Sequence, residues 1–434
     1  MAADEVSDNR QGAEEVSIFV FEDVQVDQLA PITTARSAYC ITVGSYTLLD
    51  LLGHTQQPLV GLVRPHLRTL CGLDQPHVRQ LDDPQLSDIP APVLALNARL
   101  VPSIQTLETI RQLLALGTEQ SGIVWDGDQI AAVVRPKWNW DSLASGTSAG
   151  IESVLIAAHQ LPSLEYPLKL MNYPHEVIAA NMRIINDSLL HRIASGRYTQ
   201  PKDGLFLAPG ARLGDYVLTE TQNGPIVIEN DAYVGPYTLL RGPVFIGAKT
   251  KILEHAAIKD AVSLGHTTKI GGEVEAAIVE PFSNKQHHGF LGHSYLGSWI
   301  NLGAGTCNSD LKNTYGAVNM EYPSGKATTG MQFLGCVMGD YSKTAINTGI
   351  FTGKVVGVCS MMYGFVTSNV PSFVNYARLF GQMTTLPPDV MTATQNRMFA
   401  RRKVEQRPCD MQLINDMYRL TQHERDRFGD ALVF

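Results

Sequence analysis

Residues 228–274 read IENDAYVGPYTLLRGPVFIGAKTKILEHAAIKDAVSLGHTTKIGGEV, and this stretch decides the fold. An aliphatic residue recurs at every sixth position without a slip, at Ile228, Val234, Leu240, Ile246, Ile252, Ile258, Leu264 and Ile270. A small or β-branched residue stands four places after each of them, from Ala232 to Val274. An α-helix would repeat every 3.6 residues and a simple strand every two, so neither explains a period of six.

A period of six is typical of a triangular parallel β-helix, in which each hexapeptide forms one flat face. The aliphatic side chain fills the interior, and the small residue leaves room at the corner. Three hexapeptides close one coil, and successive coils stack about 4.8 Å apart, as neighbouring strands do. We therefore expect a left-handed parallel β-helix over residues 201–375.

The six-residue frame is interrupted twice. It breaks after Val274, returns at Phe290, and returns again from Met338 to Met362. The intervening segments, 277–289 and 308–331, are polar or glycine-rich. We expect both to leave the coil as loops, which is where binding and chemistry usually lie in solenoid proteins.

The remainder of the chain divides by its pattern. Residues 1–15 are acidic and polar, which predicts a disordered tail. Residues 16–165 alternate strand-like and helical runs, which favours an α/β domain with a mostly parallel sheet. We expect a helical linker at 166–200, and C-terminal helices at 376–434 that cover the open end of the β-helix.

Composition excludes several classes of protein. The net charge is −8, the charged fraction is 18% and the hydrophobic fraction is 44%, as in ordinary globular proteins. There is no basic stripe, so we expect no nucleic-acid partner. No run approaches the roughly 18 apolar residues of a membrane span. None of the six cysteines forms a C-x-x-C pair, which favours a reduced, cytoplasmic protein.

The segment 283–306 carries the most chemistry. It contains His287, His288 and His293, three of the 12 histidines in the chain. A histidine with a near-neutral pKa can take a proton from an attacking amine or hydroxyl. Acyl transfer from a thioester also needs an N–H donor for the developing oxyanion, and a glycine-rich turn such as 303–305 offers one. The plain alternative is that these are surface histidines without a role.

This segment resembles the acetyltransferase half of the bifunctional glucosamine-1-phosphate acetyltransferase/N-acetylglucosamine-1-phosphate uridyltransferase family. That family carries a His, then Tyr-Leu-Gly, then Asn-(Ile/Val)-Gly-Ala-Gly-Thr, then Cys-Asn. The chain has His287, Phe290-Leu-Gly292, Asn301-Leu-Gly-Ala-Gly-Thr306 and Cys307-Asn308. It is most similar to a divergent bacterial branch with His-x-Gly-Phe-Leu-Gly and Phe-Glu-Asp stretches, over about residues 17–375. The resemblance implies that His287 is the catalytic base and that acetyl-CoA is the co-substrate.

The same resemblance implies further site residues. It assigns an amino-sugar phosphate to Asn301, Lys312 and Arg241, and acetyl-CoA to Asn308, Gly303 and Gly305. Family members are trimers, so a homotrimer is implied. Phe290 and Ser309 replace family tyrosines, which leaves open whether the acceptor is glucosamine-1-phosphate or another amino sugar.

The front domain departs further from the family. The family's nucleotidyltransferase begins with a G-x-G-T-R loop whose N–H groups cradle the triphosphate. Here the run from Phe21 to Thr33 contains no glycine, and Ala38 stands where a lysine is expected. The resemblance implies a nucleotide site at Arg36, Asn97 and Asn181, with Mg²⁺ and UTP or dTTP as its ligands. A site without its phosphate loop, its lysine and one metal carboxylate has lost most of its charge stabilisation.

The favoured interpretation is acetyl-CoA-dependent acyl transfer to an amino-sugar phosphate, with no assigned metal ligand. Three alternatives stay open: a sugar-1-phosphate nucleotidyltransferase as the main activity, a non-catalytic trimeric scaffold, and a metalloenzyme like the γ-type carbonic anhydrases. The last shares the β-helix, and the five-residue spacing of His288 and His293 fits two zinc ligands. The coil register after them is off by one, and His266 is the nearest candidate for a third ligand.

Overall fold

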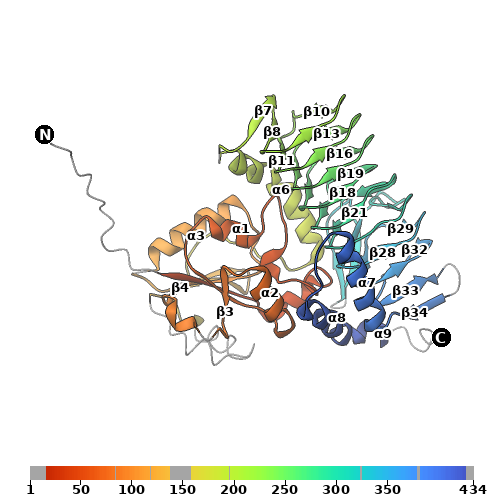
Figure 1. The fold of residues 1–434 in the computed structure, drawn as a ribbon. Helices are drawn as coiled ribbons and strands as arrows, with labels where there is room; N and C mark the ends of the chain where they lie inside the picture. The colour runs from red at the N-terminus through yellow and green to blue at the C-terminus, as the bar shows by residue number, and fades with distance from the viewer. Residues whose placement is uncertain are drawn as a thin grey trace.

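The computed structural model describes residues 16–83, 85–117, 119–136, 158–194, 196–322, 325–378 and 382–426. An α/β domain lies beside one long β-helix, and helices close the angle between the two at the bottom of Figure 1. The predicted tail, 1–15, lies outside the described residues. Within the described ranges, every helix is too short or too polar to cross a membrane.

The front domain is built on one six-stranded sheet with the order β3-β2-β1-β4-β6-β5. The strands are β1 (Ser17–Phe21), β2 (Leu59–Leu62), β3 (Val78–Gln80), β4 (Pro92–Asn97), β5 (Gly122–Asp126) and β6 (Gln129–Val134). β1 pairs in parallel with β2 and β4, and β2 with β3, whereas β6 is antiparallel to both of its neighbours. The predicted mostly parallel sheet is confirmed.

Helices cover this sheet and connect it to the β-helix. The α-helices are α1 (Leu48–Gly53), α2 (Arg68–Asp74), α3 (Ile104–Leu116) and α6 (Pro174–Ile193). Short 3-10 helices are η1 (Val24–Leu29), η2 (Ala38–Cys40), η3 (Pro65–Leu67) and η4 (Leu86–Asp88). Thr47 begins α1 with a capping box, because its hydroxyl accepts from the N–H of Asp50 and the Asp50 carboxylate accepts from the N–H of Thr47.

The β-helix has three faces that run along its axis (Figure 1), and the strands of each face are called one sheet, although hydrogen bonding divides the second and the third into two parts each. The first contains β7 (Thr199–Lys202), β8 (Leu205–Leu207), β11 (Ile226–Ile228), β14 (Val244–Ile246), β17 (Val262–Leu264), β20 (Ile278–Val279), β23 (Tyr295–Leu296), β27 (Cys336–Met338) and β30 (Lys354–Val356). The second contains β9 (Arg212–Leu213), β12 (Tyr233–Val234), β15 (Lys251–Ile252), β18 (Lys269–Ile270), β21 (Asn284–Lys285), β28 (Lys343–Thr344), β31 (Met361–Met362), β33 (Val374–Ala377) and β34 (Gln382–Thr385). The third contains β10 (Leu218–Glu220), β13 (Leu239–Arg241), β16 (Ala257–Lys259), β19 (Glu273–Glu275), β22 (Phe290–Gly292), β24 (Cys307–Asn308), β29 (Gly349–Ile350) and β32 (Phe365–Val366).

The six-residue repeat places one aliphatic side chain per face in the interior. Ile228 pairs with Ile246, and Ile246 with Leu264, on successive coils. Val234 and Ile252 pair in the same way on the second sheet. All five are buried in one hydrophobic cluster. The predicted left-handed parallel β-helix is therefore confirmed.

The prediction of a loop at 277–289 is wrong. This segment contains β20 and β21 and stays in the coil. The frame slips because one coil is shortened at its corners: Phe245 pairs with Ser263, eighteen residues on, but Ser263 pairs with Ile278, only fifteen on. A pattern of strict sixes cannot follow a coil that has lost three residues.

The segment 308–331 does leave the coil, as predicted. It carries an antiparallel hairpin of β25 (Asn319–Tyr322) and β26 (Gly325–Thr328). The hairpin reaches the start of α6, where the Tyr322 hydroxyl lies 2.9 Å from Nδ1 of His175. This projection therefore ties the β-helix to the connecting helix.

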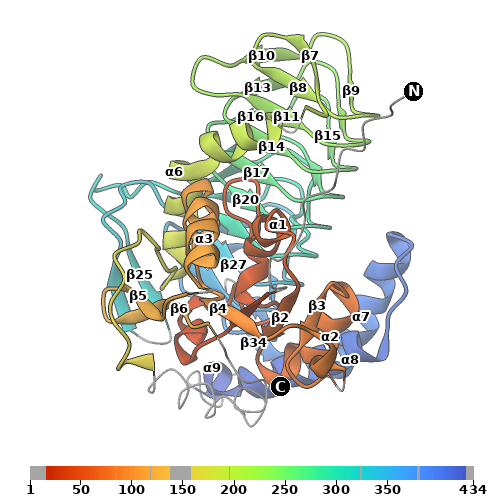
Figure 2. The same cartoon turned by 90° about the vertical axis from the view of Figure 1, so that its left-hand side faces the viewer.

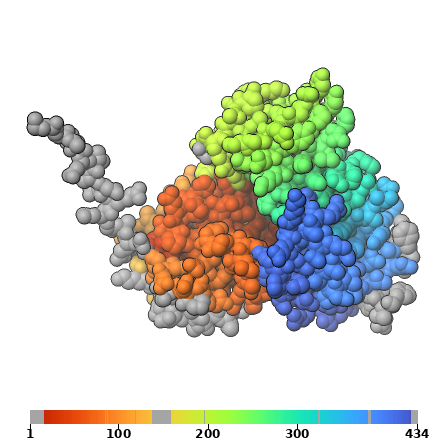
Figure 3. All heavy atoms as spheres, viewed as in Figure 1, coloured from red at the N-terminus to blue at the C-terminus, as the bar shows by residue number. Residues whose placement is uncertain are grey.

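Helix α6 runs along the outside of the first sheet of the β-helix, as the second view shows (Figure 2). Ile185 and Leu189 pack there against Val227 and Phe245. The space-filling view shows the front domain in contact with both the β-helix and the C-terminal helices (Figure 3). The front domain and the β-helix thus share buried surface.

A buried ionic cluster joins the two domains. The Arg36 guanidinium lies 3.2 Å from Oε2 of Glu280 and also pairs with Asp340. Glu280 accepts further bonds from the N–H of Thr42 at 3.0 Å and from the hydroxyl of Tyr295 at 2.8 Å. Both carboxylates belong to the β-helix and are at most 2% exposed.

The C-terminal helices are α7 (Pro388–Arg401), α8 (Pro408–Leu420) and α9 (Gln422–Asp426). Helix α7 packs against side chains at the corners of the β-helix. Trp299 stacks on Phe282, with ring centroids 4.3 Å apart, and contacts Phe399 of α7 at 4.4 Å. Arg407 reaches the front domain at Asp74, 2.6 Å away. Helix α9 lies at the last coil, where Glu424 accepts from the N–H of Ser372, and Tyr418 of α8 meets Phe373 there at 5.2 Å. Helix α7 therefore lies against the side of the β-helix, whereas α8 and α9 contact its last coil.

Replacing Arg36 by methionine leaves Glu280 and Asp340 buried without a counter-charge. We expect Arg36→Met to lower the free energy of unfolding by about 3–5 kcal/mol, measured by urea denaturation. The triple change Arg36→Met/Glu280→Gln/Asp340→Asn should recover most of this loss. As a control, Arg419→Met removes a surface pair with Asp416, and should cost less than about 1 kcal/mol. Equal losses in Arg36→Met and Arg419→Met would contradict this account.

Candidate active sites

His287 lies on the turn that joins β21 to β22 and is exposed. Its Nε2 is 3.3 Å from Nε2 of Gln286, and its carbonyl oxygen accepts a hydrogen bond from the Lys285 ammonium at 3.1 Å. Among the described residues, no carboxylate pairs with this imidazole. The ring is therefore open to a substrate, while its backbone is held from inside the coil.

Lys285 was missed by sequence reasoning. It stands in register with Ile270 and Ile252, in a column of inward-facing aliphatic residues, and is 2% exposed. Burial lowers the pKa of Lys285 from 10.5 to about 8. A lysine at an aliphatic position of the repeat would indicate a buried charge. The shortened coil shifts the six-residue frame before Lys285, so the sequence does not show that Lys285 occupies such a position.

The two glycines assigned to acetyl-CoA use their N–H groups within the β-helix. The N–H of Gly303 donates to the carbonyl of Thr344 at 3.2 Å and to its hydroxyl at 2.9 Å, and the N–H of Gly305 donates to the carbonyl of His288 at 3.1 Å. A Cβ on Gly303 would lie 2.5 Å from the carbonyl of Ala345 on the next coil. Glycine is required here for close stacking, and these two N–H groups are not free to bind an oxyanion.

Asn301 and Asn308 differ in what they can offer a ligand. Asn308 is buried, with its amide bonded to the backbone of Gly292: Nδ2 donates to the carbonyl at 3.0 Å and Oδ1 accepts from the N–H at 2.8 Å. This side chain replaces a strand pair between coils. Asn301 is half-buried, and its Oδ1 lies 3.4 Å from Nδ2 of Asn284. Asn301 therefore keeps more freedom to contact substrate.

The structure does not bring Arg241 or Lys312 to His287. Arg241 is on β13, three strands from β22 in the sheet, which corresponds to about 14 Å at normal strand spacing. It pairs with Glu220 at 2.6 Å and with Asp260 at 3.4 Å. Lys312 lies in the projecting segment, where its Nζ donates to the carbonyl of Ala317 at 2.8 Å. Each cation is occupied locally.

His293 forms a dyad that sequence reasoning did not single out. Its Nδ1 lies 2.9 Å from Oδ2 of Asp310, and its ring stacks on Phe333 at 5.4 Å. This contact engages one of the histidines invoked for a zinc site. Within the described residues, no three His, Cys, Asp or Glu side chains gather closely enough to hold a metal ion. The carbonic-anhydrase alternative therefore lacks a donor set there.

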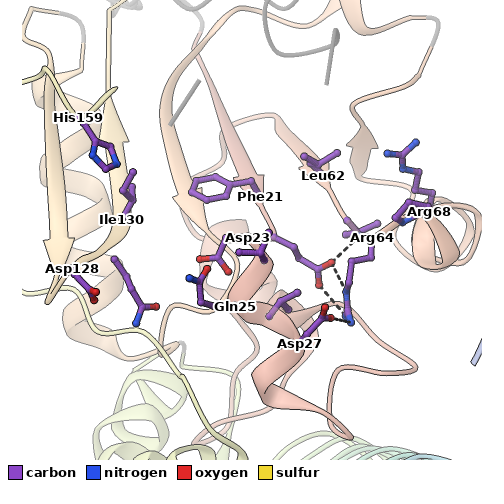
Figure 4. Close-up of a pocket in the computed structure, with 16 residues that line it drawn as sticks. Phe21, Asp23, Gln25, Asp27, Leu62, Arg64, Arg68, Asp128, Ile130 and His159 are labelled. Atoms are coloured by element: carbon purple, nitrogen blue, oxygen red, sulfur yellow. Dashed lines mark hydrogen bonds and ion pairs between the residues drawn. The ribbon is translucent and has the colours of Figure 1, made fainter. Parts of the chain in front are cut away.

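The front domain has a cavity of about 470 Å³ at the carboxyl ends of its central strands. Figure 4 shows its lining, with Asp23 and Gln25 on one side and Ile130 and His159 facing them. Crevices outside the carboxyl ends of parallel strands are where open α/β sheets bind ligands. The location suits a nucleotide. Whether a nucleotide can bind there depends on the charges and hydrogen-bond partners of the side chains that line the cavity.

A salt bridge stands where the family has its phosphate loop. Glu22, at the end of β1, accepts from the N–H of Ala38 at 2.9 Å and from the N–H of Arg64 at 2.9 Å. The Arg64 guanidinium pairs with Glu22 at 3.1 Å and donates to the carbonyl of Thr33 at 2.6 Å. The segment after β1 is thus pinned by side chains, and these groups are not available to phosphate.

The residues present do not fit Mg²⁺. Both oxygens of Asp23 face the Arg99 guanidinium, at 2.8 and 2.6 Å, and Oδ2 also accepts from Asn97 at 2.7 Å. Arg99 is 0% exposed, and its positive charge is paired with Asp23. Oδ1 of Asn97 accepts a hydrogen bond from the N–H of Arg99. A cation beside Asp23 would meet a positive charge already in place.

Arg36 and Asn181, the other two expected nucleotide ligands, lie at the junction between the domains. Arg36 serves the ionic cluster described above. Asn181 is fully buried: its Oδ1 accepts from the N–H of Gly44 and the hydroxyl of Ser263, both at 2.9 Å, and its Nδ2 donates to the carbonyl of Ala261 at 2.8 Å. The structure therefore brings neither residue to the front cavity.

Comparison with known proteins gives a family match for the front part of the chain and partial matches to bifunctional enzymes. Residues 18–197 match the family described as "Sugar nucleotidyl transferase". A bifunctional sugar-1-phosphate nucleotidylyltransferase/acetyltransferase of Sulfurisphaera tokodaii is 28% identical over 142 residues, 32% of this chain and 35% of that protein. The bifunctional protein GlmU of Azorhizobium caulinodans is 30% identical over 125 residues, 27% of this chain and 28% of that protein.

Among solved structures, the chain is similar to an Arabidopsis UDP-N-acetylglucosamine acyltransferase. The identity is 12% and the TM-score 0.21, over 54% of this chain and 98% of that one. The fold follows from the strand register, in which successive coils pair in parallel.

Fold and site thus define a protein that joins a sugar-nucleotidyltransferase-like domain to a left-handed parallel β-helix. Parts of the chain are similar in sequence to bifunctional sugar-1-phosphate nucleotidylyltransferase/acetyltransferases, and residues 18–197 are similar to sugar nucleotidyl transferases. The alignments span about a third of the length of the curated relatives it matches.

The lowered pKa of Lys285 predicts a dependence of stability on pH. Below pH 8 the lysine is charged in both folded and unfolded states, so the full cost of burying the charge is present. Between pH 8 and 10.5 the folded protein releases the proton and the unfolded chain keeps it, so the folded state gains stability. The charged and titratable groups around Lys285 are Glu273, Cys307 and His287.

We expect the free energy of unfolding of wild type, relative to that of Lys285→Met, to increase by about 2 kcal/mol between pH 7 and pH 9.5. The measurement is urea unfolding of both proteins across that range. A difference that stays constant with pH would show that Lys285 keeps its ordinary pKa.

Proposed function

We propose that this protein transfers an acetyl group from acetyl-CoA to the amine of a sugar phosphate, on the β-helix beside His287. The observation that carries the proposal is the turn 286–289. It presents an exposed imidazole at the edge of β22, one strand away from Cys307 and Asn308, while its backbone is fixed from the interior. A base held in this way needs little reorganisation when the substrate arrives.

The chemistry follows from the groups at this turn. The imidazole of His287 takes a proton from the sugar amine as its nitrogen attacks the thioester carbonyl carbon. The carbon–nitrogen bond forms and the carbon–sulfur bond breaks. The imidazolium then returns the proton to the sulfur, and CoA leaves as the thiol. Because Gly303 and Gly305 use their N–H groups in the coil, we assign the oxyanion to the N–H of Ala304 between them.

The proposed assembly is a homotrimer. The third sheet of the β-helix is covered by neither the front domain nor helices α7 to α9 in Figures 1 and 2. Its surroundings expose Tyr216, Leu218, Tyr237, Phe351 and Phe365. Apolar patches of this kind mark protein–protein contacts, and a neighbouring subunit there would line a groove for acetyl-CoA. The proposed compartment is the cytoplasm, where acetyl-CoA and sugar phosphates occur together.

Nucleotidyl transfer is not part of the proposal. The front cavity has the location of a nucleotide site, but Glu22 and Asp23 are each neutralised by an arginine. The expectation that UTP or dTTP binds there with Mg²⁺ is tested in the same assay, by adding each nucleotide to the acetylated product.

We expect His287→Ala to lower kcat by about 10²–10⁴-fold with little change in KM, because only the proton acceptor is removed. The assay follows the release of CoA thiol with glucosamine-1-phosphate and then other amino-sugar phosphates. His288→Ala is the matched control: it removes the neighbouring exposed imidazole and should leave kcat within about twofold. Equal rates for His287→Ala and wild type would remove His287 as the base, and wild type that acetylates none of the amino sugars would favour the scaffold alternative.

A further inference from the structure

A charged side chain stands inside the β-helix where the fold calls for an aliphatic one. The second sheet aligns Val234, Ile252, Ile270 and Lys285 on successive coils. The first three are buried in the hydrophobic core of the β-helix, and Lys285 continues their column at 2% exposure. A methionine or leucine would fill the same space without bringing a charge into it.

The ammonium is bonded to two turns. Nζ donates to the carbonyl of Gly271 at 2.7 Å and to the carbonyl of His287 at 3.1 Å. Gly271 follows β18 and His287 follows β21, so one side chain fastens the turns of two adjacent coils. A Cβ at Gly272, which has φ +67°, would lie 2.9 Å from Nζ. The glycine therefore leaves the space that the ammonium occupies.

No described carboxylate neutralises this charge at ion-pair distance. The nearest acidic influences are Glu273, which already pairs with Lys259 at 2.7 Å, and the Cys307 thiol on β24. A buried cation without a counter-ion is unfavourable for folding. The stability of the coil therefore does not explain why a lysine is used here, whereas the bond to the His287 carbonyl does.

We propose that Lys285 is a positioning residue for His287: from inside the coil it holds the His287 carbonyl, and thereby the turn 286–289, so that the imidazole faces the acyl donor. The inference rests on the proposed acyl transfer for its effect on rate. Its structural part, the anchoring of the turn, stands without that function.

The test compares Lys285→Met with Lys343→Met. Methionine suits an aliphatic column and removes only the ammonium. Lys343 is the matched control, since it is partly buried and has a pKa lowered to about 8, but its Nζ donates to the carbonyl of Tyr341, away from the turn. We expect Lys285→Met to melt within about 2 °C of wild type or above it. Its kcat should fall between about ten- and a hundredfold with KM for acetyl-CoA unchanged, whereas Lys343→Met keeps the wild-type kcat.

Amide hydrogen exchange measures the anchoring directly and independently of activity. In Lys285→Met the N–H groups of 286–289 should exchange faster while those of β15 and β18 stay protected; in Lys343→Met the turn should be unchanged. Unchanged exchange of the turn in Lys285→Met would overturn the proposal, and so would a melting temperature that falls in step with kcat, which marks a merely structural role. If wild type acetylates no amino sugar but the turn still loosens, the acyltransferase proposal fails and the anchoring by Lys285 stands.

Discussion

Each coil of the β-helix is held by backbone hydrogen bonds to the coils on either side, and every other feature of the molecule depends on that stacking. It aligns like positions of successive coils, so Ile228, Ile246 and Leu264 form one continuous column in the core. It also sets a strict rule at each position, because a side chain in such a column has no access to water. Lys285 is in register with the aliphatic residues of its column but carries a charge. Its buried ammonium therefore needs hydrogen-bond acceptors, which the carbonyls of the turns provide.

The same stacking gives the front domain a rigid surface to bind. Helix α6 lies along the first sheet, and the buried carboxylates of Glu280 and Asp340 face the domain from two different coils. Arg36 enters between them, and Asn181 bonds across the same junction to Ser263. The family resemblance implies that Arg36 and Asn181 bind nucleotide. In this chain they serve to join two domains, and the charges at the front cavity are paired, Glu22 with Arg64 and Asp23 with Arg99.

The division of labour between the domains follows from these contacts. The front domain keeps the sheet of a nucleotidyltransferase, but the charges at its strand ends are satisfied internally. The β-helix keeps an exposed histidine on a turn whose backbone is fixed, and a sheet that neither the front domain nor the C-terminal helices cover. Glycines at 303 and 305 allow the next coil to approach closely, so their part in the site is steric. The β-helix therefore presents an exposed imidazole, whereas Glu22 and Asp23 of the front cavity are each paired with an arginine.

The sequence by itself determined the β-helix, the mostly parallel front sheet and the segment that leaves the coil at 308–331, because a period of six, alternating strand and helix signals and a break in the period are short-range patterns. A contiguous motif also predicts the role of His287. The prediction from sequence failed at 277–289, where a coil shortened by three residues keeps its strands but loses the period. Only the tertiary structure decided that Lys285 faces inward, since that depends on its register with Ile270 across the slip. It also decided the partners of Arg36 and Asn181, which lie far away in the chain. Contacts across such separations are selected by how two folded surfaces meet, and no local periodicity records that choice.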